Sequence, residues 1–252
     1  MSIQRVEAFE ALAAVYRTGG FAVYSEALAP TLLSLAFDYS WTGRTLLDLG
    51  CGSGDLATWF AGRQFRVNGI DSVQQMVEQA EALAMRQNAD RFLAVSDIRS
   101  FRPTMQYDMV TCIGGTLNYM TSLRDLQAVF KVAQTALAPG KLFYFDLYTI
   151  QGLADGAGER VITDNDQVMV VSRSEFNYET LAQTVQCSIF QEVEDRWTRA
   201  EETHVLRGYP LQPLTKLLEN CGLRLLRTFA PDVLPVRAVR ANDMAVFVCV
   251  RE

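Results

Sequence analysis

The order of apolar and polar positions divides the chain into helical, alternating and β-rich stretches. Apolar residues at three- and four-residue spacing predict helices over 2–17 and 22–38, separated by a glycine-containing break. From there to residue 146, short apolar runs alternate with helical patterns, as in parallel strands joined by helices. The expected strands are Thr45–Leu49, Gln64–Ile70, Arg91–Val95, Tyr107–Ile113 and Lys141–Asp146, and the expected helices are Leu56–Gly62, Ser72–Asn88 and Leu123–Ala138.

After residue 150 the pattern changes. Residues 160–209 contain β-branched and aromatic runs between turn residues, which predicts antiparallel hairpins. A last helix and two closing strands are expected at Leu211–Asn220, Leu223–Phe229 and Met244–Val250.

We therefore expect an α/β fold with a doubly wound, seven-stranded, mostly parallel sheet. Residues 1–150 and 207–252 would form this core, including the N-terminal helices. Residues 151–206 would form a small antiparallel β insertion.

The segment TLLDLGCGSGDLA, Thr45–Ala57, carries the clearest chemical signal. A buried strand runs into a turn with three glycines and then a helix, the arrangement of a cofactor cradle at the carboxyl end of a parallel strand. Asp55 stands where a dinucleotide-binding turn has its third glycine, and its carboxylate would repel a pyrophosphate. A cofactor without phosphate fits better than the nicotinamide dinucleotide of an oxidoreductase.

Composition narrows the function classes. The chain has 252 residues, of which 49% are hydrophobic, and a formal net charge of −6. It can bury a substantial core, but an acidic chain is a poor general binder of nucleic acid. The five cysteines lack C-x-x-C spacing, and no signal peptide or apolar stretch of about 18 residues is present. We expect a cytoplasmic protein without a metal, nucleic-acid or membrane partner.

The motif DLGCGSGD resembles the first motif of class I S-adenosylmethionine-dependent methyltransferases. This resemblance implies a Rossmann-like sheet with S-adenosylmethionine as the cofactor. It also implies that the insertion at 151–206 caps or flanks the substrate pocket, although such a layer could instead make only a subunit contact. Asp48 would help hold the ammonium of its methionine moiety, and the turn would pass close to the cofactor. The turn residues expected at the cofactor are Gly50, Cys51, Gly52 and Gly54.

Asp71 ends the second strand about 20 residues after the glycine turn, where a carboxylate can accept both hydroxyls of a ribose. It could instead cap the following helix. The run from Asp71 through Ser72 to Met76 is similar to a family segment, in which the methionine thioether would pack on adenine. Met76 could equally be helix core.

The resemblance places further residues around the cofactor. Asp97 would accept a hydrogen bond from the adenine amino group, and the backbone N–H of Ile98 would donate to the ring, unless Asp97 is a surface turn residue. Tyr16 and Tyr24 would cover the methionyl end or merely pack an N-terminal helix. Two more cofactor contacts are expected at Cys112 and Ile113.

Two segments, YDMVTCIGGTLNY at 107–119 and FYFDLYT at 143–149, are similar to small-molecule methyltransferases, including amino-sugar N-methyltransferases. The Asn-Pro-Pro-Tyr turn of many nucleic-acid and protein amine methyltransferases is absent. The resemblance implies a small-molecule acceptor. Asn118 and Tyr119 would face the sulfonium as catalytic residues, or serve as a turn residue and a buried aromatic.

Substrate contacts are expected from the fifth strand and the end of the insertion. Asp146 could bind a substrate amine or cap a loop, and Tyr148 lies beside it. His204, Arg207 and Tyr209 form an H-x-x-R-x-Y pattern similar to one in the resembled subfamily. His204 could act as a general base or be structural, and Arg207 could hold a carboxylate, with Tyr209 nearby.

The sequence thus predicts methyl transfer to a small-molecule amine or hydroxyl by in-line displacement. A cofactor-binding module or scaffold subunit without catalysis is the alternative. A monomer or a homodimer is compatible with either.

Overall fold

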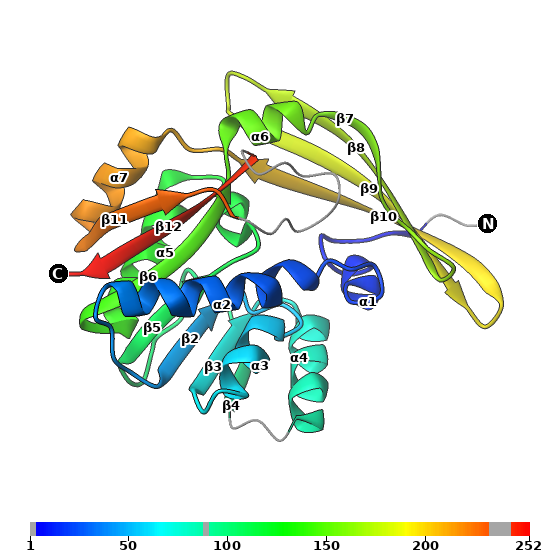
Figure 1. Cartoon of the computed structure of the whole chain (residues 1–252). Helices are drawn as coiled ribbons and strands as arrows, with labels where there is room; N and C mark the ends of the chain where they lie inside the picture. The colour runs from blue at the N-terminus through cyan, green and yellow to red at the C-terminus, as the bar shows by residue number, and fades with distance from the viewer. Residues whose placement is uncertain (1–3, 88–90, 232–242) are drawn as a thin grey trace.

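The computed structural model describes residues 4–87, 91–231 and 243–252, which form two sheets flanked by helices (Figure 1). The larger sheet has seven strands in the order β11-β12-β6-β5-β2-β3-β4. Its strands are β2 (Thr45–Leu49), β3 (Arg66–Asp71), β4 (Arg91–Val95), β5 (Tyr107–Cys112), β6 (Leu137–Tyr148), β11 (Leu223–Phe229) and β12 (Met244–Arg251).

Strand direction in the larger sheet is mostly parallel, because β12 alone runs antiparallel to its two neighbours β6 and β11. The parallel strands bring their carboxyl ends to one edge, and the loops that carry the chemistry follow there. The predicted fold class is confirmed.

Helices cover both faces of this sheet. On one face, apolar side chains of α2 and α3 pack on β2, β6 and β12 in one core cluster, and α4 lies beside α3. On the other face, α5 and α7 pack on β2, β5 and β6 in a second cluster. The helices are α2 (Val23–Asp38), α3 (Asp55–Ala61), α4 (Gln74–Arg86), α5 (Leu123–Ala136) and α7 (Leu211–Asn220).

The smaller sheet has the order β1-β10-β9-β8-β7 and is antiparallel apart from its edge strand β1. A short helix, α6, connects β6 of the larger sheet to the smaller sheet. A third apolar cluster joins the smaller sheet to the N-terminal helix α1. The elements are β1 (Gln4–Arg5), α1 (Leu12–Val15), α6 (Ile150–Asp155), β7 (Gly158–Asp164), β8 (Val168–Asn177), β9 (Ala182–Val193) and β10 (Arg196–Arg207).

The predicted helix over 2–17 is wrong for most of its length. Gln4 and Arg5 pair in parallel with Ala200 and Glu201 of β10, and only Leu12–Val15 is helical. Strand pairing with a distant segment has replaced the local helix, so Gln4 and Arg5 belong to the smaller sheet. Residues 2 and 3 of that prediction lie outside the described residues.

Element boundaries differ elsewhere by a few residues. Helix α5 ends at Ala136 and β6 begins at once, so that Pro139 and Gly140 lie within the strand. Gly140 has a φ of +75°, and the paired register with β5 shifts in this part of the strand. The predicted end of α4, Asn88, is outside the described part of the chain.

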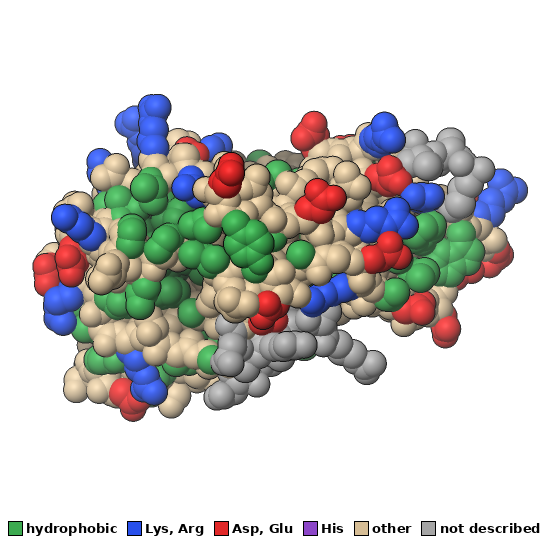
Figure 2. Space-filling view, turned by 90° about the horizontal axis from the view of Figure 1, so that it is seen from above, with side chains coloured by type: hydrophobic (Ala, Val, Ile, Leu, Met, Phe, Trp, Pro, Cys, Tyr) green, Lys and Arg blue, Asp and Glu red, His purple; other side chains and the backbone are tan. Residues whose placement is uncertain are grey.

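Figure 2 views the molecule from above and shows acidic and basic side chains interspersed among hydrophobic ones. All five cysteines are free and buried. Within the described ranges, no helix combines the length and apolar character needed to cross a membrane.

Candidate active site

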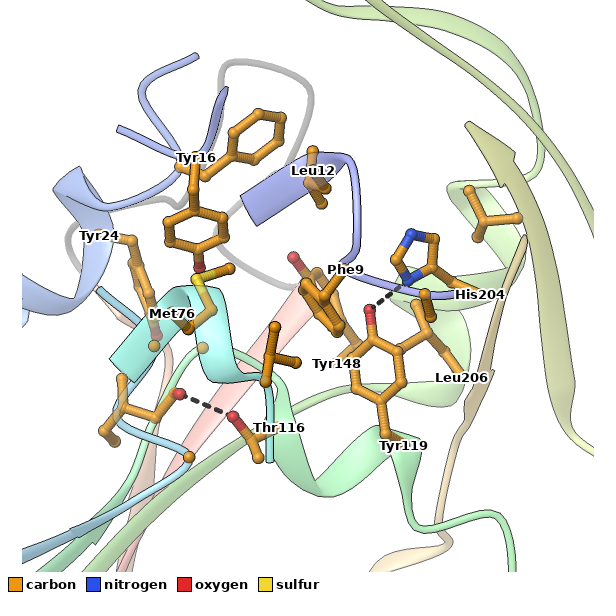
Figure 3. A pocket seen from close by; sticks show the side chains of 18 of the residues that line it. Phe9, Leu12, Tyr16, Tyr24, Met76, Thr116, Tyr119, Tyr148, His204 and Leu206 are labelled. Atoms are coloured by element: carbon orange, nitrogen blue, oxygen red, sulfur yellow. Dashed lines mark hydrogen bonds between the residues drawn. The ribbon is translucent and has the colours of Figure 1, made fainter. Parts of the chain in front are cut away.

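A cavity of about 570 Å³ lies where the N-terminal segment and the inner face of the smaller sheet meet the carboxyl edge of the larger sheet. The cavity unites most of the predicted site residues, which come from all three of these parts (Figure 3). The predicted residues that line it are Tyr16, Tyr24, Asp48, Gly50, Cys51, Gly52, Asp71, Ser72, Met76, Asp97, Ile98, Ile113, Tyr119, Tyr148 and His204.

The glycine turn forms one wall of the cavity, and a side chain would be unfavourable at Gly52 and Gly54 for different reasons. Gly52 has a φ of +51°, and an added Cβ there would meet nothing within 4 Å, so its backbone faces open space. Gly54 has a φ of +78°, and its added Cβ would lie 2.7 Å from Cβ of Ala80. Gly52 therefore lets a ligand approach the backbone, whereas Gly54 lets α3 approach α4 and does not line the cavity.

Asp71 supports the same turn from the end of β3. Its Oδ2 accepts the backbone N–H of Gly52 at 2.9 Å, and its Oδ1 accepts that of Val73 at 2.9 Å. Burial raises the pKa of Asp71, while these N–H donors oppose the rise. Each carboxylate oxygen can accept a further hydrogen bond, so Asp71 has capacity left for ligand hydroxyls. The alternative role of Asp71 as a helix cap is partly met as well, because Asp71 accepts the N–H of Val73, the residue that directly precedes α4.

Asp48 is a buried carboxyl at the base of the cavity. Its Oδ1 accepts the Thr111 hydroxyl at 2.7 Å. Burial raises the pKa of Asp48 to about 7; the Thr111 hydrogen bond opposes this rise and the nearby Asp71 charge adds to it. A cation bound beside Asp48 would stabilise its ionised form.

Asp97 and Ile98 line the cavity after β4, but the Asp97 carboxylate already has a partner. Arg99 donates to both of its oxygens, with the shortest contact at 2.6 Å, and this ion pair lowers the pKa of Asp97. The adenine contact predicted for Asp97 stays a prediction.

Asp55 does not present a bare charge to the cavity. Its carboxylate pairs with Arg17 and accepts from the hydroxyl of Ser53. Charge repulsion is therefore a weaker argument against a pyrophosphate than the sequence indicated. The compact glycine spacing remains the stronger one.

Asp146 is fully buried below the cavity and supports a loop. Its oxygens accept the Tyr24 hydroxyl at 2.8 Å and the backbone N–H groups of Gly114 and Gly115 at 3.0 and 2.7 Å. Burial raises its pKa to about 6 against these hydrogen bonds. Of the two predicted roles, the loop cap is the one that the geometry provides, and the substrate-amine role is not.

Four other predicted residues lie outside the cavity lining for similar reasons. The Asn118 side-chain amide donates to the backbone carbonyls of Tyr148 and Arg207, and its oxygen accepts the backbone N–H of Tyr148. Arg207 donates to the Thr121 carbonyl at 2.7 Å, and Tyr209 to that of Met120. These are internal structural contacts. Cys112 is the last residue of β5 and belongs to the apolar cluster that α5 and α7 form with the larger sheet.

Tyr119 and His204 form a hydrogen-bonded pair in the cavity, where β10 of the smaller sheet borders it (Figure 3). The Tyr119 oxygen lies 3.1 Å from Nδ1 of His204, and Nε2 lies 3.1 Å from the Glu202 carboxylate. A carboxylate only accepts, so in the neutral imidazole this network places the proton on Nε2 and makes Nδ1 the acceptor of the Tyr119 hydroxyl. Burial raises the pKa of Tyr119 well above its usual value, which keeps it protonated.

Sequence reasoning did not identify Glu202 or the apolar lining near His204. Glu202 is buried, and although burial alone would raise its pKa, hydrogen bonds from His204 and backbone N–H groups lower it. Its position two residues before the single histidine on one strand face was the available signal. The apolar lining there includes Phe9, Leu12, Ile162, Val185 and Leu206.

The part of the smaller sheet that lines the cavity also carries neutral hydrogen-bonding groups. Ser172, Ser174 and Gln183 line it from β8 and β9, and the Gln183 amide donates to the Ser174 hydroxyl at 3.2 Å. Among the residues that the structure describes, no three His, Cys, Asp or Glu side chains gather as a metal site would require.

Comparison with known proteins agrees with this geometry. Residues 46–140 match the family model described as a methyltransferase domain. The provisionally assigned methyltransferase YqeM of Bacillus subtilis (strain 168) is 27% identical over 188 residues, which are 73% of this chain and 75% of YqeM.

A second relative is the dTDP-4-amino-2,3,4,6-tetradeoxy-D-glucose N,N-dimethyltransferase of Saccharopolyspora spinosa, 28% identical over 190 residues, or 72% of each chain. Among solved structures, an S-adenosylmethionine-dependent methyltransferase from Clostridium acetobutylicum ATCC 824 aligns with a TM-score of 0.82 at 21% identity, covering 96% of this chain and 98% of that one. This last likeness is one of fold. Residues 46–140 of this chain are thus a methyltransferase domain.

Proposed function

We propose that the chain transfers the methyl group of S-adenosylmethionine to a hydroxyl or amine of a small molecule. The observation that carries the proposal is one cavity shared by two sets of residues. The glycine turn with Asp48 and Asp71 lies at one end, and the pair of Tyr119 and His204 at the other. A cofactor and an acceptor can therefore lie side by side in a partly enclosed space.

The residues at the first end fit the cofactor. Asp71 would accept ribose hydroxyls, the open backbone at Gly52 would pass along the adenosyl group, and Asp48 would face the ammonium. When bound, S-adenosylmethionine supplies an electrophilic methyl carbon whose bond to sulfur breaks as the acceptor attacks.

The second end would handle the acceptor's proton. The Tyr119 oxygen, whose own proton points to His204, can accept a hydrogen bond from an acceptor hydroxyl and direct its lone pair. As the acceptor oxygen forms its new bond to carbon, its proton moves to the Tyr119 oxygen and the Tyr119 proton moves to Nδ1. The Glu202 carboxylate stabilises the imidazolium that results.

A neutral amine acceptor would attack without such help and lose its proton afterwards by the same route. The Saccharopolyspora spinosa relative, named for an amino-sugar substrate, supports an amine. The Tyr119–His204 pair supports a hydroxyl, since an amine requires no base. In both cases the lining favours an acceptor with an apolar body and a few neutral polar groups.

The test is turnover with methyl-labelled S-adenosylmethionine over a panel of amino sugars, aliphatic amines and phenols. Labelled product from at least one class supports the proposal. His204→Ala should lose a hydroxyl-directed activity by about 100-fold and an amine-directed activity far less. Cofactor binding without product from any acceptor would favour a module that binds S-adenosylmethionine without catalysis.

A further inference from the structure

The Glu202 carboxylate is where two separate parts of the cavity wall are joined. Its side chain is fully buried, with a relative exposure of 0%. On the sheet side it accepts from Nε2 of His204 at 3.1 Å. On the N-terminal side it accepts three backbone N–H groups, from Phe9 at 3.0 Å, Leu12 at 2.8 Å and Ala11.

Residues 8–16, which we name the N-terminal cover, pass over the cavity after β1 has run along β10. The N–H of Val6 donates to the Glu201 carbonyl at 3.0 Å, so the strand pairing extends up to the cover. Ala8, Phe9, Leu12 and Tyr16 of the cover line the cavity. The regular structure of the cover is the short helix α1, and Glu202 accepts the backbone N–H groups of Ala11 and Leu12 where this helix begins.

Phe9 donates its N–H to Glu202 although its backbone has an unfavourable conformation. Its φ is +69°, in the left-handed region that is unfavourable for a residue with a bulky side chain. The result is that its ring faces the catalytic pair, with centroids 5.2 Å from Tyr119 and 5.1 Å from His204 (Figure 3). The same carboxylate that binds the Phe9 N–H thus orients the imidazole against which the Phe9 ring packs.

We propose that Glu202 is a positioning residue that sets the His204 tautomer and the N-terminal cover together. It does not line the cavity and would not touch the acceptor. Its single negative charge receives four donors, and an uncharged side chain of equal size could satisfy fewer of them. Only its importance for catalysis rests on the proposed function; the coupling itself is a property of the fold.

The chain offers a clean measurement because His204 is its one histidine. In protein labelled with ¹⁵N-histidine and freed of any affinity tag, the ring-nitrogen shifts report the tautomer directly. We expect the Nε2-protonated form alone in the unsubstituted protein and a mixture in Glu202→Gln. Hydrogen exchange at the amides of Phe9, Ala11 and Leu12 should accelerate by about 10-fold in the same variant.

The matched control is Glu201→Gln, which removes the neighbouring carboxylate that pairs with Arg199 and with Arg5, both of which lie outside the cover. It should leave both the tautomer and the exchange rates unchanged. S-adenosylhomocysteine affinity, measured by calorimetry, should change less than about 3-fold in Glu202→Gln, because Asp48 and Asp71 lie on the larger sheet and Tyr16 follows the residues whose N–H groups Glu202 accepts.

The proposal is overturned if Glu202→Gln keeps the single tautomer or the slow exchange of the cover. If circular dichroism shows that this variant does not fold, Glu202→Asp takes its place with the same readouts, since its shorter side chain cannot reach both parts. Neither readout needs turnover, so an inactive enzyme would refute the proposed function without bearing on the coupling.

Discussion

Replacing Asp71 by asparagine should weaken S-adenosylhomocysteine binding without unfolding the chain. The two Asp71 oxygens accept from Gly52 and Val73, each at 2.9 Å. An amide has one oxygen, so one N–H would face an NH₂ group, and the charge available to ribose hydroxyls would be lost. Hydrogen bonds to a charged group contribute about 1.5–3 kcal/mol, and their loss corresponds to roughly a 10- to 150-fold rise in Kd.

Isothermal titration calorimetry with S-adenosylhomocysteine measures this rise. The control is Asp108→Asn, which removes another carboxylate that accepts backbone N–H groups, from Arg44 at 2.9 Å and Thr45 at 3.1 Å. Asp108 precedes Met109 near the amino end of β5, away from the cavity lining. It should lose stability but keep cofactor affinity. A Kd within about twofold of the unsubstituted value in folded Asp71→Asn would refute the ribose role.

Three further predictions concern catalysis, pH and packing. Tyr119→Phe should lower turnover of a hydroxyl acceptor by about 100-fold at unchanged S-adenosylhomocysteine affinity, and equal loss of both would count against its role as a proton relay. The pKa of Asp48, raised by burial to about 7, lies above its unfolded value of about 3.9, so its contribution to stability is present below pH 4 and is lost as the pH rises through 7. The Tm of the ligand-free protein should therefore fall between about pH 4 and about pH 7, and Asp48→Asn should reduce that fall; an identical pH profile in the variant contradicts the assignment. Gly54→Ala, whose Cβ would lie 2.7 Å from that of Ala80 at a φ of +78°, should cost about 1–3 kcal/mol in urea unfolding, and an unchanged midpoint would show that α3 and α4 can separate freely.

Local signals made the larger sheet and the cofactor end of the cavity predictable. Strand β2, the glycine turn and α3 are consecutive, and Asp71 is found from the end of the next strand. Each depends on residues within a few positions of one another, and the order of strands and helices then places them at one sheet edge. Strand β11 and helix α7 fall at the predicted boundaries for the same reason.

The end of the cavity at Tyr119 and His204 depends on contacts between segments far apart in the chain, which a local sequence pattern cannot reveal. The apolar spacing of residues 2–17 is compatible with a helix, yet β1 pairs with β10 and Glu202 takes the N–H groups that helix formation would have used. Asp146 was expected at the cavity because it ends a predicted strand, and Asn118 because of the resemblance to small-molecule methyltransferases. Their polar groups are instead occupied by nearby backbone, which only the folded geometry reveals.

The central claim is that this cavity binds the adenosyl cofactor, and calorimetric titration of the folded, unsubstituted protein with S-adenosylhomocysteine tests it most directly. The account predicts one binding site per chain, with a Kd between about 1 µM and 1 mM. The absence of any binding heat or competition by S-adenosylmethionine, in protein whose circular dichroism shows it to be folded, would contradict it.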